Sequence, residues 1–296
     1  SKKEKNTGNY YIYGFARNTD KALIIFKNFF NQKNTNEEAL LRKNHSITTS
    51  YNEDLVNNKH IIKYNNHILE INFLDIENEE SINKAAKYLS NQKIILKSNN
   101  ENIKLSKLII ATGILHNQNL KLFEHKNNTK LSDAELMPEK SLKEINPSNL
   151  INLYKINTIG PIIIVKHFIG LMKLTRHNTL NNKMAVIAIL SGKVGSISDN
   201  YLGGWHGYRS SKAALNMIIK NIAIEYKYKF NNFVIISIHP GTVTSNLSKP
   251  FIKNLPKDHK LMHSYESADN IIKLLNNLDI SNSGKIMSYN GSIISY

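Results

Sequence analysis

The sequence contains no cysteine. Disulfide bonds, thiolate nucleophiles and cysteine-ligated zinc sites are therefore excluded. The sequence also lacks any apolar run near the ~20 residues that a membrane-spanning helix needs. No apolar signal segment follows the lysines of residues 1–5. We therefore predict a cytoplasmic protein with no membrane partner.

Acidic residues are the minority among the charged side chains: 39 Lys and Arg accompany 23 Asp and Glu, for a formal net charge of +16. Such an excess is compatible with nucleic-acid binding. The basic residues are scattered singly through a sequence rich in Lys, Asn and Ile, with no Arg-rich helix and no patch interleaved with aromatic residues. We therefore predict that the charge reflects composition and that nucleic acid is not a partner.

Apolar segments of strand length alternate with segments of helical periodicity. The continuous apolar runs 184–190 and 233–238 are typical of central strands covered on both faces. The alternation predicts an α/β fold, a Rossmann-type doubly wound parallel sheet, with residues 1–296 as a single domain and 121–135 as a surface insertion. Further strands are predicted at 10–14, 46–51, 67–73, 107–111 and 283–289, and helices at 19–30, 81–89, 147–174, 206–228 and 267–278.

Tyr208 and Lys212 occupy positions i and i+4 of a predicted helix, so their side chains share one face. A phenol with a pKa of about 10 is a poor base at neutral pH, and a neighbouring ammonium lowers that pKa. The pair fits an acid/base couple that protonates a carbonyl oxygen as a hydride arrives. In isolation, a Tyr and a Lys at this spacing are more often a chance pair on the surface. The surrounding motifs therefore decide whether the pair is catalytic.

Three further motifs accompany the pair in a fixed order. Asn157 stands before it, Ser191 ends the first central strand, and Pro240 follows the second. This ordered set resembles the short-chain dehydrogenase/reductase family. The segments VGSISDNYLGGW (194–205), YRSSKAALNM (208–217) and HPGTVTSNL (239–247) are similar to its C-factor-like and Sniffer-like carbonyl reductase branch.

The resemblance implies an enzyme that transfers a hydride between NAD(P)(H) and a small carbonyl or alcohol substrate. Tyr208 would be the general acid/base. Lys212 would lower its pKa and hold the nicotinamide ribose, and Asn157 would support a water linking Lys212 to solvent. Asp75 would hold the adenine, unless it caps a turn or a helix. No metal site is expected, and the implied cofactor-binding residues are Gly14, Arg17, Asn18, Asp75, Ala111, Gly113, Tyr208, Lys212, Pro240, Val243 and Ser245.

The first turn departs from the glycine-rich loop of the family, because Gly14 is the only glycine within 13–20. Asn18 can adopt glycine-like backbone angles, whereas the carboxylate of Asp20 would repel a pyrophosphate. Arg17 could offset that charge, and it resembles the arginine with which NADP-preferring members grip the 2′-phosphate. We therefore expect NADP(H) to be preferred and NAD(H) to be the alternative, if the altered loop binds a dinucleotide.

The serine that hydrogen-bonds the substrate oxygen is the second departure. The family pattern, set on this sequence by loop length and by Gly195, places this serine at Gly192. We choose Ser191, with Ser196 in reserve, although a shift of one residue at a strand end turns a side chain to the other face. The two departures together leave open a non-catalytic alternative, in which the protein keeps the fold for binding or signalling.

Two segments are expected to shape the substrate pocket. They are the loop 198–205, whose Trp205 either lines the pocket mouth or anchors the loop, and the segment 246–263, which resembles a flexible substrate lid. Members of the family usually form dimers or tetramers through their two long helices. We therefore expect a homodimer or homotetramer built on 147–174 and 206–228.

Overall fold

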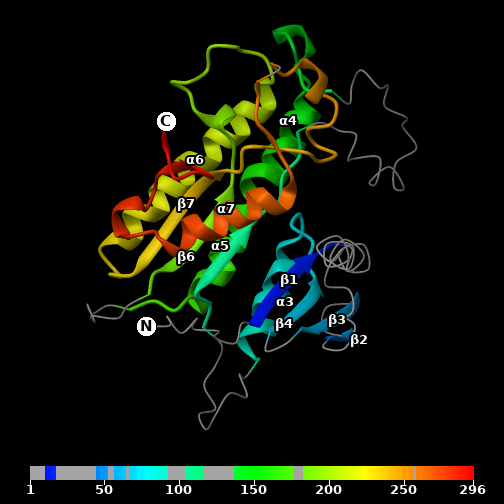
Figure 1. The fold of residues 1–296 in the computed structure, drawn as a ribbon, viewed down its shortest axis with the longest axis vertical. Helices are drawn as coiled ribbons and strands as arrows, with labels where there is room; N and C mark the ends of the chain where they lie inside the picture. Colours follow the sequence, from blue (N-terminus) through cyan, green and yellow to red (C-terminus); the bar gives the residue numbers. More distant parts are fainter. Residues whose placement is uncertain are drawn as a thin grey trace, which may run out of the picture. The chain divides into compact units, whose positions relative to one another are not determined.

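The computed structural model describes residues 11–17, 45–52, 57–64, 67–92, 104–115, 137–175, 183–256 and 258–296. The chain packs as two compact units, residues 1–103 and 104–296 (Figure 1). The single domain expected from the sequence stays a prediction. The predicted helix 19–30, the insertion 121–135, Asn18 and Asp20 lie outside the described residues.

The first unit contains a four-stranded sheet in the order β1-β4-β3-β2. Strands β1 (Tyr11–Ala16) and β4 (His67–Phe73) are parallel, whereas β3 (Asn57–Tyr64) runs antiparallel to both β4 and β2 (His45–Asn52). The predicted strand at 46–51 is confirmed as β2. Its expected parallel pairing is wrong, because only residues 53–56 separate it from β3, and a parallel pair needs a crossover of a dozen or more residues.

Helix α3 (Glu79–Ser90) follows β4. Its start is set by Asn78, whose side chain accepts a hydrogen bond from the backbone N–H of Ser81 at 3.2 Å. Two glutamates in the first turn complement the positive end of the helix. The apolar residues recur at helical spacing and are buried: Ile82, Ala85, Ala86 and Leu89.

The second unit contains a five-stranded sheet in the order β11-β10-β7-β6-β5. Strands β5 (Lys107–Ile110), β6 (Ala185–Leu190), β7 (Phe233–His239) and β10 (Ile286–Ser288) are parallel, and β11 (Ile293–Ile294) pairs antiparallel with β10. The central strands expected from the apolar runs are therefore confirmed. A separate parallel pair joins β8 (Thr242–Val243) to β9 (Leu261–Met262).

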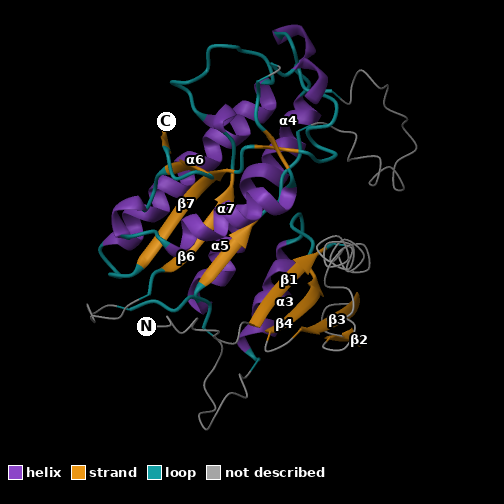
Figure 2. Cartoon of the chain, viewed as in Figure 1, coloured by secondary structure: helices purple, strands orange, loops and turns teal. Residues whose placement is uncertain are grey.

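Helices cover both faces of this second sheet (Figure 2). On one face, α7 (Ser264–Asn276) packs Ile271 and Leu275 against alternate residues of β6 and β7. On the other face lies α6 (His206–Lys227), whose Tyr226 ring is 5.1 Å from that of Phe233. Each fully buried Ile or Leu stabilises the fold by roughly 1.5–3 kcal/mol. The continuous apolar sequence of β6 and β7 follows from this burial on both faces.

The predicted helix 147–174 is not continuous. It consists of α4 (Pro147–Tyr154), a π-helical turn η5 (Lys155–Ile159), α5 (Gly160–Phe168) and a 3₁₀ turn η6 (Ile169–Leu171). Pro161 has no N–H to donate to the carbonyl four residues earlier, and Gly160 N–H instead bonds the carbonyl of Lys155, five residues earlier. This π turn carries Asn157, as such turns often carry functional residues.

Short 3₁₀ turns connect the remaining elements: η4 (Leu142–Glu144), η7 (Lys193–Gly195), η8 (Ile252–Asn254) and η9 (Ile280–Asn282). Within the described part of the chain, none of the helices has the length and apolar character required to cross a membrane.

Candidate active site

The candidate site lies at the carboxyl ends of β5, β6 and β7, the edge at which open α/β sheets bind ligands. Gly113 follows β5, Gly192 follows β6, and Pro240 follows β7. Helix α6 carries Tyr208 in its first turn and Lys212 one turn later.

Tyr208 is half-buried at the start of α6. Its ring meets that of Trp205 edge-on, with centroids 6.3 Å apart. Burial raises the pKa of Tyr208 to about 12, because a phenolate loses its hydration there. The lowered pKa expected from the sequence is therefore not found in this arrangement, in which desolvation outweighs the neighbouring ammonium.

Lys212 is almost completely buried beside Tyr208. Its Nζ donates to the carbonyl oxygen of Leu190 at 3.0 Å and lies 5.9 Å from the centroid of the Tyr208 ring. Burial lowers the pKa of Lys212 to about 8, so the side chain is still mostly an ammonium at neutral pH. The two functional side chains predicted from the i, i+4 spacing are thus brought together.

Asn157 is fully buried and forms three hydrogen bonds. Its Oδ1 accepts from the N–H of Ile114 at 2.8 Å, and its Nδ2 donates to the carbonyl of Ile114 at 2.8 Å and to Oγ of Ser211 at 3.2 Å. The side chain therefore fastens the loop after β5 to the π turn and to α6. Its expected role in supporting a water beside Lys212 stays a prediction.

Neither candidate serine has its hydroxyl directed at Tyr208. The hydroxyl of Ser191 donates to Oδ1 of Asn216 at 2.9 Å. Ser196 is buried, and its Oγ accepts from the N–H of Asp199 at 3.1 Å. These contacts thus do not support Ser191 as the serine that bonds the substrate oxygen. Its position directly after β6 directs its side chain to α6.

Gly192 is the residue of this loop that faces the phenol. A Cβ on Gly192 would lie 4.0 Å from the Tyr208 hydroxyl and 3.2 Å from Cγ2 of Val194. Its backbone is extended, a conformation open to any residue. The position at which the family pattern places the serine therefore carries no hydroxyl.

The loop after β5 contains Ala111 and Gly113, both implied to contact the cofactor. Ala111 is exposed. Gly113 packs against the two buried polar side chains of the site, because a Cβ there would lie 3.3 Å from Nζ of Lys212 and 3.4 Å from Oδ1 of Asn157. A larger residue at Gly113 would displace the lysine.

Pro240, Val243 and Ser245 follow β7 in a tightly bonded loop. The carbonyl of Pro240 accepts from the hydroxyl of Ser267 at 2.7 Å, and the N–H of Ser245 donates to Oγ of Ser248 at 3.0 Å. Gly241 has φ +78°, and a Cβ there would lie 2.1 Å from Cε of Met262. Glycine is thus required at this turn for both backbone conformation and space.

The segment 246–263, which the sequence predicts to be a substrate lid, contains Phe251, whose ring lies 4.9 Å from that of Trp205. Trp205 has φ 52°, an uncommon value for a residue with a side chain. Because Trp205 contacts both Tyr208 and Phe251, these contacts favour its role at the pocket mouth.

The first unit holds the remaining implied cofactor residues at the carboxyl ends of β1 and β4. Gly14 lies inside β1, paired with Ile71, because the strand runs two residues past its predicted end. Arg17 follows the strand and forms ion pairs with Asp75 and Glu77. Oδ1 of Asp75 accepts from the N–H of Glu77 at 3.0 Å, so Asp75 caps this turn, and its expected contact with the adenine stays a prediction.

Sequence reasoning missed two buried polar residues that support Tyr208. Oε2 of Glu139 accepts from the N–H of Gly207 at 3.3 Å, where a carboxylate complements the positive end of α6. The hydroxyl of Thr158 donates to the carbonyl of Ser211 at 2.8 Å. Thr158 could have been found from the sequence, because it lies next to Asn157. No local pattern connects Glu139 with Gly207.

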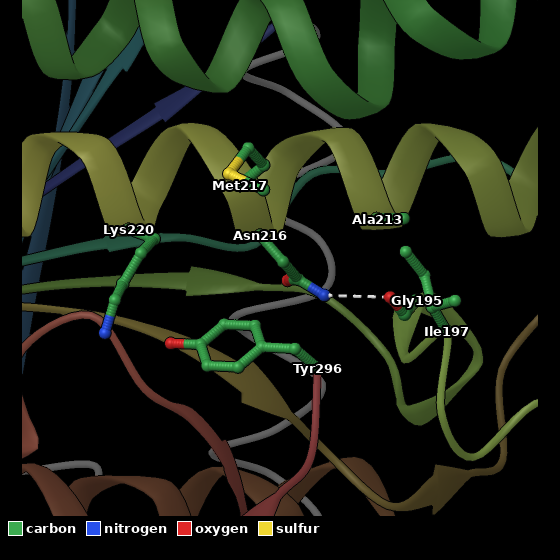
Figure 3. Close-up of a pocket in the computed structure, with 7 residues that line it drawn as sticks. All are labelled: Gly195, Ile197, Ala213, Asn216, Met217, Lys220 and Tyr296. Carbon is green, nitrogen blue, oxygen red and sulfur yellow. Dashed lines mark hydrogen bonds between the residues drawn. The ribbon is translucent and has the colours of Figure 1, made fainter.

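A separate hollow of about 210 Å³ lies along α6. Figure 3 shows the Tyr296 ring beside Lys220 and the hydrogen bond from Asn216 to the carbonyl of Gly195. Tyr208 and Lys212 do not line this hollow, so it carries none of the chemistry described above. Within the described ranges, no three His, Asp or Glu side chains gather as metal ligands.

A model of the short chain dehydrogenases matches residues 127–255, the stretch that contains Asn157, Tyr208 and Lys212. Residues 127–255 are thus similar to the short-chain dehydrogenases. Its structural similarity to the carbonyl reductase Sniffer of D. melanogaster has a TM-score of 0.62 at 18% identity, over 97% of this chain and 88% of that one. At this identity the similarity shows the fold, and the Rossmann-type α/β fold is confirmed.

Three proteins of similar sequence match this chain over different shares of its length. The 1-hydroxy-2-glutathionyl-2-methyl-3-butene dehydrogenase of Rhodococcus sp. (strain AD45) is 30% identical over 142 residues, 48% of this chain and 56% of that enzyme. An oxidoreductase of Schizosaccharomyces pombe is 28% identical over 299 residues, 97% of each protein. The C-signal protein of Myxococcus xanthus is 23% identical over 152 residues, 51% of this chain and 81% of that protein. The match thus spans little more than half of the Rhodococcus enzyme.

Proposed function

We propose that this protein is an NAD(P)(H)-dependent oxidoreductase that reduces a small carbonyl compound or oxidises the corresponding alcohol. The observation that carries the proposal is the pairing of Tyr208 with Lys212 on one face of α6. Their atoms lie 5.9 Å apart, from Nζ to the ring centroid, at the carboxyl edge of a parallel sheet.

The polar groups of the second unit fit the nicotinamide ribose. An ammonium has three protons to donate, and among the described residues Lys212 uses one of them on the carbonyl of Leu190. Two protons remain for ribose hydroxyls. Gly113 provides a close approach to the same lysine without a side chain of its own.

A bound nicotinamide supplies the hydride, and the protein supplies the proton. A pKa of about 12 keeps Tyr208 protonated at neutral pH, so its hydroxyl can donate to the substrate oxygen as negative charge develops there. The ammonium of Lys212 stabilises the phenolate that Tyr208 becomes. Asn157 maintains this geometry, because it holds the loop after β5 against α6.

The substrate oxygen has Tyr208 as its donor and no serine beside it, because Gly192 occupies that side of the phenol. One donor orients a carbonyl less strictly than two. We therefore propose slow turnover and tolerance of different small carbonyl substrates, with Trp205 and Phe251 at the pocket mouth. Membership in the Sniffer-like carbonyl reductase branch belongs to the same proposal.

The decisive experiment is a titration of the purified protein with NADH and NADPH, followed by cofactor fluorescence, and then a screen of small aldehydes and ketones. We expect micromolar binding of at least one dinucleotide and its oxidation by a carbonyl substrate. Absence of binding at millimolar dinucleotide would contradict the proposal.

A non-catalytic protein that keeps this fold for binding or signalling is the second candidate. Two observations favour it: Gly192 lacks the serine hydroxyl, and Arg17 is already paired with two carboxylates. Dinucleotide binding without turnover of any carbonyl would support this candidate over the enzyme. The homo-oligomeric state and the cytoplasmic location stay predictions.

A further inference from the structure

Helix α6, which carries Tyr208, begins without a side-chain cap of its own. The residue before the helix is Trp205, and its side chain forms no capping hydrogen bond. The first N–H groups of a helix have no partner within that helix. Gly207 carries one of these groups and is buried, so water does not replace the missing acceptor. An acceptor from elsewhere in the chain is therefore needed directly before Tyr208.

Glu139 provides this acceptor from a segment 68 positions away in the sequence. The residue is only 5% exposed, and its Oε2 accepts from the N–H of Gly207 at 3.3 Å. Its backbone carbonyl accepts from the N–H of Trp205. The backbone and the side chain of one residue thus bind the chain just before and just after the point at which α6 begins.

The turn that Glu139 binds has an unusual backbone. Gly203, Gly204 and Trp205 have φ values of 63°, 61° and 52°, so three successive residues are left-handed. Glycine adopts such values freely, but a tryptophan keeps them only where its surroundings hold it. Nε of Arg209 also donates to the carbonyls of Gly203 and Gly204, each at 3.2 Å. Glu139 and Arg209 together therefore fix this turn.

The packing around the Glu139 carboxylate is close. A Cβ on Gly207 would lie 2.9 Å from Oε1 of Glu139 and 2.6 Å from Cδ1 of Leu153, so only a glycine lets the carboxylate approach this backbone. Among the described residues, Oε1 is buried and has no hydrogen-bond partner. Burial of a carboxylate with an unpaired oxygen costs free energy. Stability alone therefore does not account for Glu139 at this place.

We propose that Glu139 is the positioning residue for Tyr208 and Trp205, and that it sets where the phenol and the indole meet the substrate. The inference rests on the proposed function. Glu139 acts through its hydrogen bonds to Gly207 and Trp205 and takes no part in the proton transfer. Because the rings of Trp205 and Tyr208 meet edge-on with centroids 6.3 Å apart, a movement of the turn displaces both.

The test measures carbonyl turnover, dinucleotide affinity and the fluorescence of Trp205, the only tryptophan of the sequence. Glu139→Ala leaves the N–H of Gly207 without its acceptor. We expect kcat to fall by roughly tenfold to a hundredfold, since a small displacement of a reacting group has an effect of this size. The emission of Trp205 should shift, and dinucleotide affinity should stay near that of wild type. Glu139→Gln keeps an oxygen for the same bond and should retain both kcat and emission.

Glu225→Ala is the matched control, because exposed Glu225 lies on the same helix and pairs with Lys229 at 2.7 Å. All kinetics are recorded below the thermal midpoint of each variant, so a loss of stability alone would leave kcat and emission unchanged. Unchanged kcat and emission in Glu139→Ala, or an equal loss in Glu139→Gln, would overturn the inference alone. A wild type that turns over no carbonyl would overturn it together with the proposed function. If Glu139→Ala does not fold, Glu139→Asp, whose carboxylate is one methylene shorter, decides the matter by the same measurements.

Discussion

Burial governs the Tyr208–Lys212 pair at the scale of single residues. The same desolvation raises the pKa of the phenol to about 12 and lowers that of the ammonium to about 8, because each charged form loses water. In the proposed function, Tyr208 gives a proton and Lys212 stabilises the phenolate that results. The protonated phenol is the form that the proposed reduction of a carbonyl requires.

Removal of the phenolic hydroxyl tests the proton donor. Tyr208→Phe should lower kcat by roughly 10²–10⁴-fold, the usual contribution of a positioned acid, while dinucleotide binding and the thermal midpoint stay near those of wild type. Steady-state kinetics and thermal unfolding provide the measurements. Tyr228→Phe, at an exposed tyrosine directly after α6, is the control. Undiminished turnover in Tyr208→Phe would refute the assigned role.

The lowered pKa of Lys212 has a consequence for stability. Between pH 8 and pH 10 the unfolded chain holds a proton on this lysine that the folded chain has lost, so folding stability rises with pH. We expect the free energy of unfolding of wild type to gain roughly 2 kcal/mol over this interval relative to Lys212→Met. Urea unfolding at several pH values measures the difference. Parallel pH profiles for the two proteins would contradict the lowered pKa.

Gly192 permits a gain-of-function test. Gly192→Ser places a hydroxyl beside that of Tyr208 after a small movement of Val194, whose Cγ2 would lie 3.2 Å from the new Cβ. A second donor to the developing oxyanion should raise kcat/KM for a carbonyl substrate by about tenfold. Gly192→Ala adds the same Cβ without the hydroxyl and should show no gain. Equal rates for both variants would mean that the substrate oxygen lies elsewhere.

At the scale of elements, the π turn η5 joins three segments of the second unit. Its Asn157 binds both backbone groups of Ile114 and the hydroxyl of Ser211. Thr158 adds a bond to the backbone of α6. An ordinary α-helix would rotate these two side chains relative to the rest of α5, so the extra residue of the π turn sets their direction.

Truncation of Asn157 should therefore destabilise the second unit. Asn157→Ala leaves the buried N–H and C=O of Ile114 without partners, which costs about 2–4 kcal/mol. Asn157→Asp keeps only the acceptor for the Ile114 N–H. Its loss of stability should be comparable, because burial of a carboxylate also costs free energy. Chemical denaturation measures both, with Asn221→Ala, at an exposed asparagine of α6, as the control. An unchanged midpoint in Asn157→Ala would exclude this bracing role.

At the scale of the whole molecule, exposed apolar side chains mark two helices of the second unit. Ile151 on α4 is 65% exposed, and Met217 on α6 is 62% exposed. These are the helices through which the sequence predicts self-association. Apolar side chains gathered on an open helix face are typical of an interface.

Light scattering tests that assembly. We expect a dimer or tetramer for wild type and a shift towards monomer for Met217→Glu, because a charge buried in an interface loses its hydration. Leu202→Glu, at a loop residue that is 91% exposed, should leave the mass unchanged. A wild-type monomer would overturn the prediction. A mass that is unaffected by Met217→Glu would move the interface away from α6.

Local patterns in the sequence determined the parallel sheet of the second unit and the shared face of Tyr208 and Lys212. Continuous apolar runs indicate strands buried on both faces, and i, i+4 spacing fixes a common helix face wherever the helix lies. The resemblance to the family pattern, aligned by loop length, also predicts the position of the missing serine at Gly192. These features depend on neighbours in the chain, which the sequence displays directly.

Only the tertiary structure decided which partners the polar side chains have for their hydrogen bonds. The direction of Ser191 towards Asn216, the occupation of Arg17 by Glu77, and the raised pKa of Tyr208 depend on partners far away in sequence or on burial. Burial and long-range pairing are properties of the packed chain, and no local pattern specifies them.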